Sequence, residues 1–113
     1  MANKIKVILT SFEQFYKYKY NPTITVSEKV ESILKYSNIL NISTKVMQCK
    51  YSTIKDEVYH LYKSDPDIIL SLGLGAARTS LNIESLAQNE YNSLTPDNEG
   101  IVLKGNPIIE KGK

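Results

Sequence analysis

The sequence predicts an α/β fold in which a mixed, largely parallel sheet is flanked by helices. Three short apolar runs, at residues 4–11, 42–49 and 67–72, have the aliphatic and β-branched composition of buried strands. Between them lie two segments whose apolar residues recur at helical spacing. The order strand, helix, strand, helix, strand favours parallel neighbours joined by right-handed crossovers.

The first strand is expected over residues 4–11, and the first helix follows a loop. Ile5, Val7, Ile8 and Leu9 make this run almost continuously apolar, which is typical of a strand covered on both faces. In the next segment, Asn21 can cap a helix that has Pro22 at its first position, and Ser37 and Asn38 can end it. The stripe expected to face the sheet consists of Val26, Val30, Ile33 and Leu34.

The second helix lies between the strands at 42–49 and 67–72. Ser52 or Thr53 can cap it, and Thr53 with Asp56 gives the spacing of a capping box. The helix is expected to stop before Pro66, because the residue preceding a proline avoids the helical region. Its apolar stripe consists of Ile54, Val58, Leu61 and Tyr62.

After the third strand, the sequence has a glycine-containing turn at 73–78 and then a segment in which apolar and polar residues alternate. If residues 80–89 are extended, Leu81 and Ile83 point to a buried side and Glu84 points away from it. Residues 97–100 have the composition of a turn. The last residues, 101–113, lack any period and are expected to form a loose tail.

The composition describes one domain, residues 1–113, without a strong charge bias. A net charge of +2 is too small to argue for a nucleic-acid partner, and the Tyr–Lys run at 16–20 is better explained as a solvated loop. No stretch approaches the ~20 apolar residues that a membrane span needs. Cys49 is the single cysteine, so no internal disulfide can form, and a cytoplasmic location is expected. One cysteine and one histidine provide no metal-binding cluster.

Two ordered motifs cover most of the chain. The first runs from Ser11 to Lys17 and continues at residues 21–23, Asn-Pro-Thr. The second consists of Gly73, Arg78, Glu84, Asn89 and the sequence Pro-Asp-Asn-Glu-Gly at 96–100. Their order and spacing resemble the signature of pyroglutamyl peptidase I, the pyrrolidone-carboxylate peptidase family of cysteine peptidases.

The resemblance implies hydrolysis of an N-terminal pyroglutamyl group from peptides, with such peptides as partners and without any cofactor. In that family a cysteine thiolate attacks, a histidine carries the proton, and an acidic residue orients the histidine. Glu84 occupies the position of the acid, which makes it the candidate catalytic residue. Phe12 and Phe15 match the phenylalanines that line the ring pocket. Arg78, the only arginine, lies in the loop at the same end of the sheet and is expected to contribute to substrate binding.

The resemblance covers only about the first half of a family member, so we expect a truncated α/β/α sandwich. The chain ends before the family's catalytic cysteine and histidine, which predicts that it is inactive alone. Cys49 and His60 occupy neither position. The resemblance also requires Glu84 to lie near Phe12 and Phe15, because a carboxylate far from them on an outer surface would make the kinship superficial.

Departures from the family pattern leave other interpretations open. Tyr16 and Lys17 replace paired glycines, which would strain or reshape the loop if it needs positive φ. Phe12 and Phe15 could simply plug the end of the sheet, and Glu84 and Arg78 could be ordinary surface charges. The alternative functions are a non-catalytic protein that binds pyroglutamyl groups and an interaction protein that self-associates through an exposed sheet edge.

Overall fold

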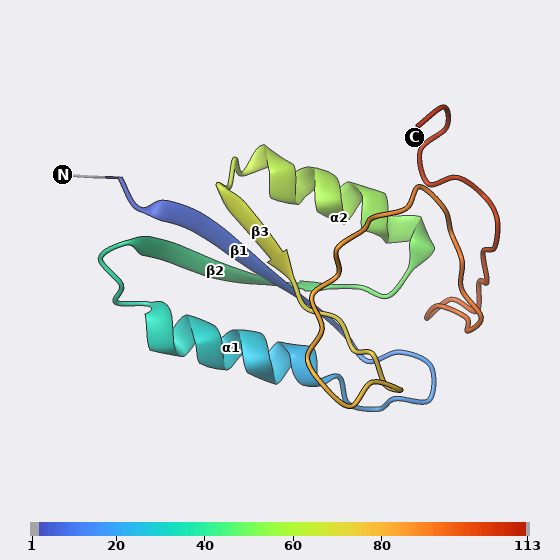
Figure 1. Cartoon of the computed structure of the whole chain (residues 1–113), viewed down its shortest axis with the longest axis horizontal. Helices are drawn as coiled ribbons and strands as arrows, with labels where there is room; N and C mark the ends of the chain where they lie inside the picture. Colours follow the sequence, from blue (N-terminus) through green and yellow to red (C-terminus); the bar gives the residue numbers. More distant parts are fainter. Residues whose placement is uncertain (1–2, 113) are drawn as a thin grey trace.

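The described part of the chain forms a three-stranded parallel sheet with one helix on each side (Figure 1). This architecture is seen in a computed structural model that describes residues 3–112, so both ends of the predicted domain, residues 1–2 and 113, lie outside it. The elements are β1 (Ile5–Phe12), α1 (Pro22–Leu34), β2 (Leu40–Met47), α2 (Tyr51–Lys63) and β3 (Ile68–Ser71). The predicted α/β class is therefore confirmed, and every strand pairing in the described sheet is parallel.

The central strand is β1, since the strand order is β2-β1-β3. It pairs with β2 over its whole length, from Ile5 opposite Leu40 to Phe12 opposite Met47. With β3 it pairs only over the four residues 7–10. The apolar centre of β1 is buried, as its almost continuous apolar run predicted, because a helix covers each face of the sheet.

The core on one face of the sheet lies under α2. Ile8 of β1, Met47 of β2 and Leu61 of α2 form a buried cluster, and Phe12, Ile54 and Ile69 pack against it. Ile54 and Leu61 belong to the predicted apolar stripe of this helix. Val58 and Tyr62, also predicted there, are exposed, because only a narrow side of α2 faces the sheet.

On the other face, α1 begins as predicted but presents a different side. Asn21 caps it by accepting a hydrogen bond from the Thr23 backbone N–H at 3.1 Å, and Pro22 follows at the first helical position. Thr23 and Ser27 are buried, whereas Ile33 is 77% exposed and Val26 is also exposed. The predicted stripe was therefore wrong for these two residues. The Thr23 hydroxyl bonds both the Phe12 backbone N–H, at 3.0 Å, and Asn21, and these polar contacts set the rotation of the helix.

The start of α2 also differs from the prediction. The helix begins at Tyr51, and its N-cap residue, Lys50, provides no side-chain hydrogen bond. The carboxylate of Asp97 accepts the hydrogen bond from the Tyr51 N–H instead, at 2.8 Å. The cap predicted at Ser52 or Thr53 was wrong because the acceptor comes from a segment far away in the sequence.

Residues 80–89 do not form a strand in the part of the chain that the structure describes. Leu81 and Ile83, expected on a buried side, are 103% and 97% exposed. An alternating pattern buries its apolar side only when the segment joins a sheet, and no strand pairs with this one. The expectation of a buried side was therefore wrong for the described chain.

The segment predicted as a loose tail is irregular, yet hydrogen bonds connect it to residues 89–93. The Tyr91 backbone N–H donates to Asn106 O at 2.8 Å, and that of Ser93 donates to Leu103 O at 3.0 Å. The Asn89 side chain accepts from the Ile109 N–H at 2.7 Å and donates to its carbonyl oxygen at 2.8 Å. Within residues 3–112 no helix combines the length and apolar character needed to cross a bilayer.

Candidate substrate pocket

Two loops at the carboxyl end of the sheet are joined by the side chain of Glu13. Its Oε1 accepts hydrogen bonds from the Cys49 backbone N–H at 3.2 Å and from Asn98 Nδ2 at 2.9 Å. Asn98 Nδ2 also donates to Gln14 O at 2.8 Å, and its backbone N–H donates to Cys49 O. The loops after β1 and β2 are thus fixed to each other and to the turn at 97–100. In parallel sheets this is the end at which binding sites form.

The turn at 97–100 is built around the carboxylate of Asp97. Oδ2 caps α2 through Tyr51, while Oδ1 accepts from the backbone N–H groups of Glu99 at 2.8 Å and Ile101 at 2.9 Å. Gly100 closes the turn with a φ of +81°, a conformation that glycine adopts without strain. The composition of residues 97–100 predicted a turn, and these contacts agree with it.

The Asp97 carboxylate is held in its charged form. Partial burial tends to raise the pKa of Asp97, but the three backbone N–H donors from Tyr51, Ile101 and Glu99, together with the nearby Lys50, outweigh that effect. The pKa of this carboxyl group therefore lies below its usual value. A charged acceptor at the N-terminus of α2 also interacts favourably with the helix dipole.

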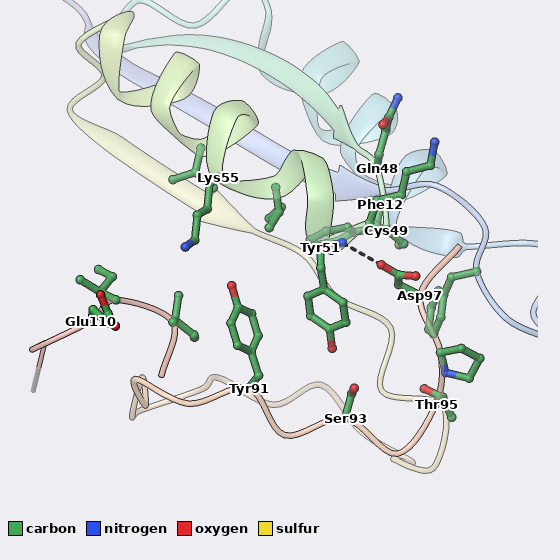
Figure 2. A pocket seen from close by; sticks show the side chains of 17 residues that line it. Phe12, Gln48, Cys49, Tyr51, Lys55, Tyr91, Ser93, Thr95, Asp97 and Glu110 are labelled. Carbon is green, nitrogen blue, oxygen red and sulfur yellow. Dashed lines mark hydrogen bonds between the residues drawn. The ribbon is translucent and has the colours of Figure 1, made fainter. Parts of the chain in front are cut away.

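Beside these contacts lies a cavity of about 1000 Å³ (Figure 2). Phe12 and Phe15 belong to its wall, together with residues of α2 and of the segment 91–110. Tyr51 and Tyr91 meet edge to face across it, with ring centroids 5.2 Å apart. Figure 2 shows Phe12 toward one end and Lys55 and Glu110 toward the other, so the cavity is elongated. Most of its lining is apolar or aromatic, as binding sites for small organic groups commonly are.

Cys49 lines the same cavity but lacks the surroundings of a nucleophile. Its Sγ donates to the Glu13 carbonyl oxygen at 3.5 Å. Burial, together with the negative charges of Glu13, Glu57 and Asp97, raises the pKa of the Cys49 thiol to about 11. A reactive cysteine needs cationic neighbours that lower its pKa, so this thiol remains protonated at neutral pH.

His60 is not arranged as a base for that thiol. It is exposed on α2, and its Nδ1 lies 2.7 Å from the carbonyl oxygen of Asp56 in the preceding turn. It does not line the cavity that contains Cys49. The two residues therefore form no nucleophile–base pair, which needs hydrogen-bond contact.

Arg78 and Glu84 pair with each other outside the cavity. Arg78 Nη1 lies 2.7 Å from Glu84 Oε1, with the side chains 50% and 72% exposed. In the turn before them the Arg78 backbone N–H donates to Gly75 O, and Arg78 Cδ lies only 3.0 Å from the place that a Cβ on residue 75 would take. Of the predicted site residues, the structure brings Phe12 and Phe15 into one cavity, and Arg78 and Glu84 into a separate ion pair.

The loop that carries Phe15 takes up the conformation that its missing glycines suggested. Tyr16 has a φ of +54°, in the left-handed region. The Tyr18 N–H donates to Phe15 O at 3.0 Å, and the Phe15 and Tyr18 rings are 5.5 Å apart. The loop thus keeps a glycine-like turn although a tyrosine occupies it, at some cost in backbone strain.

Several residues of the site were missed by sequence reasoning. Glu13 was part of the first motif, between the two phenylalanines, but no role was inferred for it. No pattern in the sequence indicated that Tyr51 and Tyr91 face each other, because one lies at a helix start and the other in an irregular segment. Among the described residues, no group of three or more His, Cys, Asp or Glu side chains could hold a metal ion.

The fold and the cavity define a class of protein. It is an open parallel α/β domain whose binding site lies at the carboxyl ends of its strands, bounded by the loops that follow β1 and β2. The chemistry within this class depends on the residues of those loops and not on the sheet.

Comparison with known proteins identifies the family. The sequence model described as pyroglutamyl peptidase matches residues 5–113. A pyrrolidone-carboxylate peptidase of Lysinibacillus sphaericus is 35% identical over 109 residues, which are 95% of this chain and 52% of that protein. The protein of the same name from Pyrococcus furiosus is 30% identical over 106 residues, 93% of this chain and 50% of that protein.

Solved structures agree with the sequence comparison. A mutant pyrrolidone carboxyl peptidase from Pyrococcus furiosus superposes with a TM-score of 0.88 at 27% identity, covering 96% of this chain and 52% of that one. The enzyme from Fervidobacterium islandicum superposes with a TM-score of 0.85 at 28% identity, covering 97% and 52%. The chain belongs to the pyroglutamyl peptidase family, and it spans about half the length of the curated relatives that it matches.

Family membership holds although Glu84 is exposed and absent from the cavity that Phe12 and Phe15 line. The condition that tied the kinship to a Glu84 next to these phenylalanines was therefore wrong. The exposure of one side chain within an irregular segment reports on local packing, whereas the family match depends on residues 5–113.

Proposed function

We propose that this chain is the part of a pyroglutamyl peptidase that recognises the pyroglutamyl group. Phe12 and Phe15 contact the flat lactam ring, since aromatic faces pack well against planar groups. The observation that carries the proposal is that both phenylalanines line one largely apolar cavity, which Glu13 and Asn98 hold in shape. Peptides that begin with pyroglutamate are the corresponding ligands.

Glu84 has the role of orienting a histidine that lies outside this stretch of chain. Its carboxylate would accept a hydrogen bond from the imidazole and favour the imidazolium, which in turn favours a cysteine thiolate. Its present partner, Arg78, is exposed, and exposed ion pairs contribute little free energy. Replacing Arg78 with an imidazole as the partner of Glu84 therefore costs little free energy. In the same proposal Arg78, once it has left Glu84, contacts a backbone carbonyl group of the bound peptide.

In this proposal the thiol-peptidase reaction needs a nucleophile and a base from elsewhere. Cys49 has a raised pKa and His60 is bonded to its own helix, so neither serves. The 113-residue chain alone is expected to bind pyroglutamyl groups without cleaving them. It is also expected in the cytoplasm, where a protein with one unpaired thiol stays reduced.

Binding can be tested by titrating the chain with pyroglutamyl amide and following amide chemical shifts. Residues around Phe12, Phe15 and Tyr51 are expected to shift. Prolyl amide, which has the same ring without the lactam carbonyl, is the matched control and should bind more weakly. Phe15→Ala should weaken binding, while Tyr36→Ala, which changes an exposed aromatic residue just after the end of α1, should not. Equal responses to the two amides would contradict the proposed recognition.

Catalysis is tested separately with a fluorogenic pyroglutamyl substrate. The purified chain is expected to give no turnover above buffer. Turnover that disappears in Cys49→Ser would contradict the assignment of the nucleophile to another segment. Binding without turnover supports the proposal.

A further inference from the structure

The cavity that Phe12 and Phe15 line is larger than a pyroglutamyl group requires. Its volume is about 1000 Å³, at the upper end of the roughly 300–1000 Å³ found for sites that enclose drug-sized ligands. A pyroglutamyl group has only about eight non-hydrogen atoms and fills a small part of such a volume. When the lactam ring lies against the two phenylalanines, the rest of the cavity is therefore open to the part of a peptide that follows the ring.

We call this remaining part of the cavity the far arm. It lies between α2, which contributes Lys55 and Val58, and the irregular segment that contributes Tyr91 and residues 108–110. Val58 and Ile109 supply aliphatic surface that solvent can reach, with exposed fractions of 36% and 66%. A ligand side chain that covers this surface removes it from water, which favours binding in proportion to the apolar area covered.

Two hydrogen-bond donors also point into the far arm. Figure 2 shows the amino group of Lys55 and the hydroxyl group of Tyr91 directed toward each other across the cavity. Within residues 3–112 the ion pair is that of Arg78 with Glu84, which leaves the Lys55 charge without a carboxylate partner there. An ammonium group and a phenol hydroxyl that face one largely apolar space are complementary to a carboxylate, because both can donate to its oxygens.

A pyroglutamyl dipeptide has the chemistry that fits both features of the far arm. Its first residue is a neutral lactam without an ammonium group, so its main-chain charge is the carboxylate of the second residue. That carboxylate and the side chain of the second residue come directly after the ring. A large apolar or aromatic side chain matches the aliphatic surface, and the carboxylate matches the two donors.

We propose that the far arm recognises the second residue of a pyroglutamyl dipeptide whose side chain is large and apolar. The side chain packs on Val58 and Ile109. The carboxylate accepts hydrogen bonds from Lys55 and Tyr91, which makes these two the residues that select a free carboxylate. Glu110 lies at the same end of the cavity and weakens this attraction by its own negative charge. The inference rests on the proposed function, because the lactam ring must occupy the other end of the cavity.

The first test compares ligands on the unmodified chain by titration followed through amide chemical shifts. Pyroglutamyl-phenylalanine should bind at least about tenfold more tightly than pyroglutamyl amide, because it buries an aromatic side chain. Pyroglutamyl-glycine should gain much less. The amide of pyroglutamyl-phenylalanine has the same side chain without the charge and should bind about threefold more weakly than the acid, as is typical of exposed charge pairs. Equal affinity for pyroglutamyl-phenylalanine and pyroglutamyl amide would overturn the inference and leave the proposed function intact.

The second test uses variants to identify the residues that hold the carboxylate. Lys55→Gln should remove the preference for the acid over its amide. Lys63→Gln is the matched control, since Lys63 is an exposed lysine of the same helix that does not line the cavity, and it should keep the preference. Glu110→Gln should strengthen binding of the acid by about twofold and leave the amide unchanged. A preference for the acid that survives Lys55→Gln would overturn the proposed contact.

N-acetylphenylalanine separates this inference from the proposed function, because it has the side chain and the carboxylate but lacks the lactam ring. If it binds, and binds more weakly to Lys55→Gln, while pyroglutamyl amide does not bind, the far arm is supported and the recognition of the ring is contradicted. If pyroglutamyl amide binds and N-acetylphenylalanine does not, with no gain for the dipeptide, the far arm alone is overturned. The absence of a response to all of these ligands would overturn both proposals.

Discussion

Asp97 caps helix α2 by accepting a hydrogen bond from the Tyr51 backbone N–H at 2.8 Å, across 46 residues of sequence. The same carboxylate organises the turn at 97–100 through Glu99 and Ile101. One side chain therefore couples the irregular second part of the chain to the helix that covers one face of the sheet. This coupling positions the wall of the cavity, because Tyr51 and Asp97 both line it.

Replacing Asp97 with alanine should lower the free energy of unfolding by about 1 kcal/mol, the usual effect of losing a helix cap. Asp97→Asn should cost less, since an amide oxygen still accepts a hydrogen bond. Urea denaturation measures both, with a shift in midpoint and an unchanged m-value. Glu28→Ala, an exposed acidic residue on α1, is the control and should leave the midpoint unchanged.

The contribution of Asp97 should also depend on pH. Because its pKa is lower in the folded chain than in the unfolded chain, its stabilisation is present above the unfolded value of about 4 and is lost as the pH falls toward the folded value. The stability difference between the natural chain and Asp97→Asn should therefore shrink below about pH 4. Urea midpoints at neutral and acidic pH measure it. A difference that stays constant would mean that the carboxylate charge does not contribute.

Cys49 should react slowly with thiol reagents at pH 8, because its raised pKa, about 11, leaves almost no thiolate. The labelling rate should rise steeply between pH 9 and 11, while the urea-unfolded chain labels rapidly throughout. A folded pKa above the unfolded one also means that stability declines over the same interval. Fast labelling of the folded chain at pH 8 would contradict the described surroundings of the thiol.

At position 16 a glycine variant should be more stable than an alanine variant, which reverses the usual order of the two residues. At its φ of +54° a Cβ costs roughly 1–2 kcal/mol, so Tyr16→Gly should be more stable than Tyr16→Ala by about 1 kcal/mol. Comparing these two variants removes the loss of the tyrosine ring from the measurement. Lys17→Gly against Lys17→Ala provides the control, because Lys17 is not among the residues with positive φ. Thermal denaturation suffices, and a more stable Tyr16→Ala would contradict the turn geometry.

Ser11→Ala should raise stability by about 1 kcal/mol. The Ser11 hydroxyl on β1 is fully buried and has no hydrogen-bond partner among the described residues, and an unsatisfied buried hydroxyl costs about 1–3 kcal/mol. Ser27→Ala is the matched control, since Ser27 is equally buried but donates to Ile24 O at 2.9 Å. Ser27→Ala should therefore gain less than Ser11→Ala. The reverse order in urea denaturation would show that Ser11 is satisfied in solution.

Much of the sheet could be predicted because its signals are local. Asn21 and Pro22 mark the start of α1, and the run of β1 is apolar enough to require cover on both faces. The order of elements then restricts the sheet to parallel neighbours. The boundaries of β2 and the start of α2 were displaced by two or three residues, as expected where strand and helix ends depend on distant partners.

The candidate site could be predicted only in part. Phe12 and Phe15 were identified from their motif, but Glu13 between them was not, because its role depends on meeting Cys49 and Asn98. The pairing of Arg78 with Glu84 was likewise absent from the sequence reasoning. A six-residue separation in an irregular segment does not determine whether two charges meet.

The sequence by itself determined the element order, the parallel sheet and the family, because each depends on residue type and spacing along the chain. Only the tertiary structure decided which side of α1 is buried, which residue caps α2, and which apolar side chains remain exposed. These depend on contacts between distant segments, such as Thr23 with Phe12 and Asp97 with Tyr51. The sequence pattern limits the contacts that a residue can make, and the tertiary fold determines which partner it contacts.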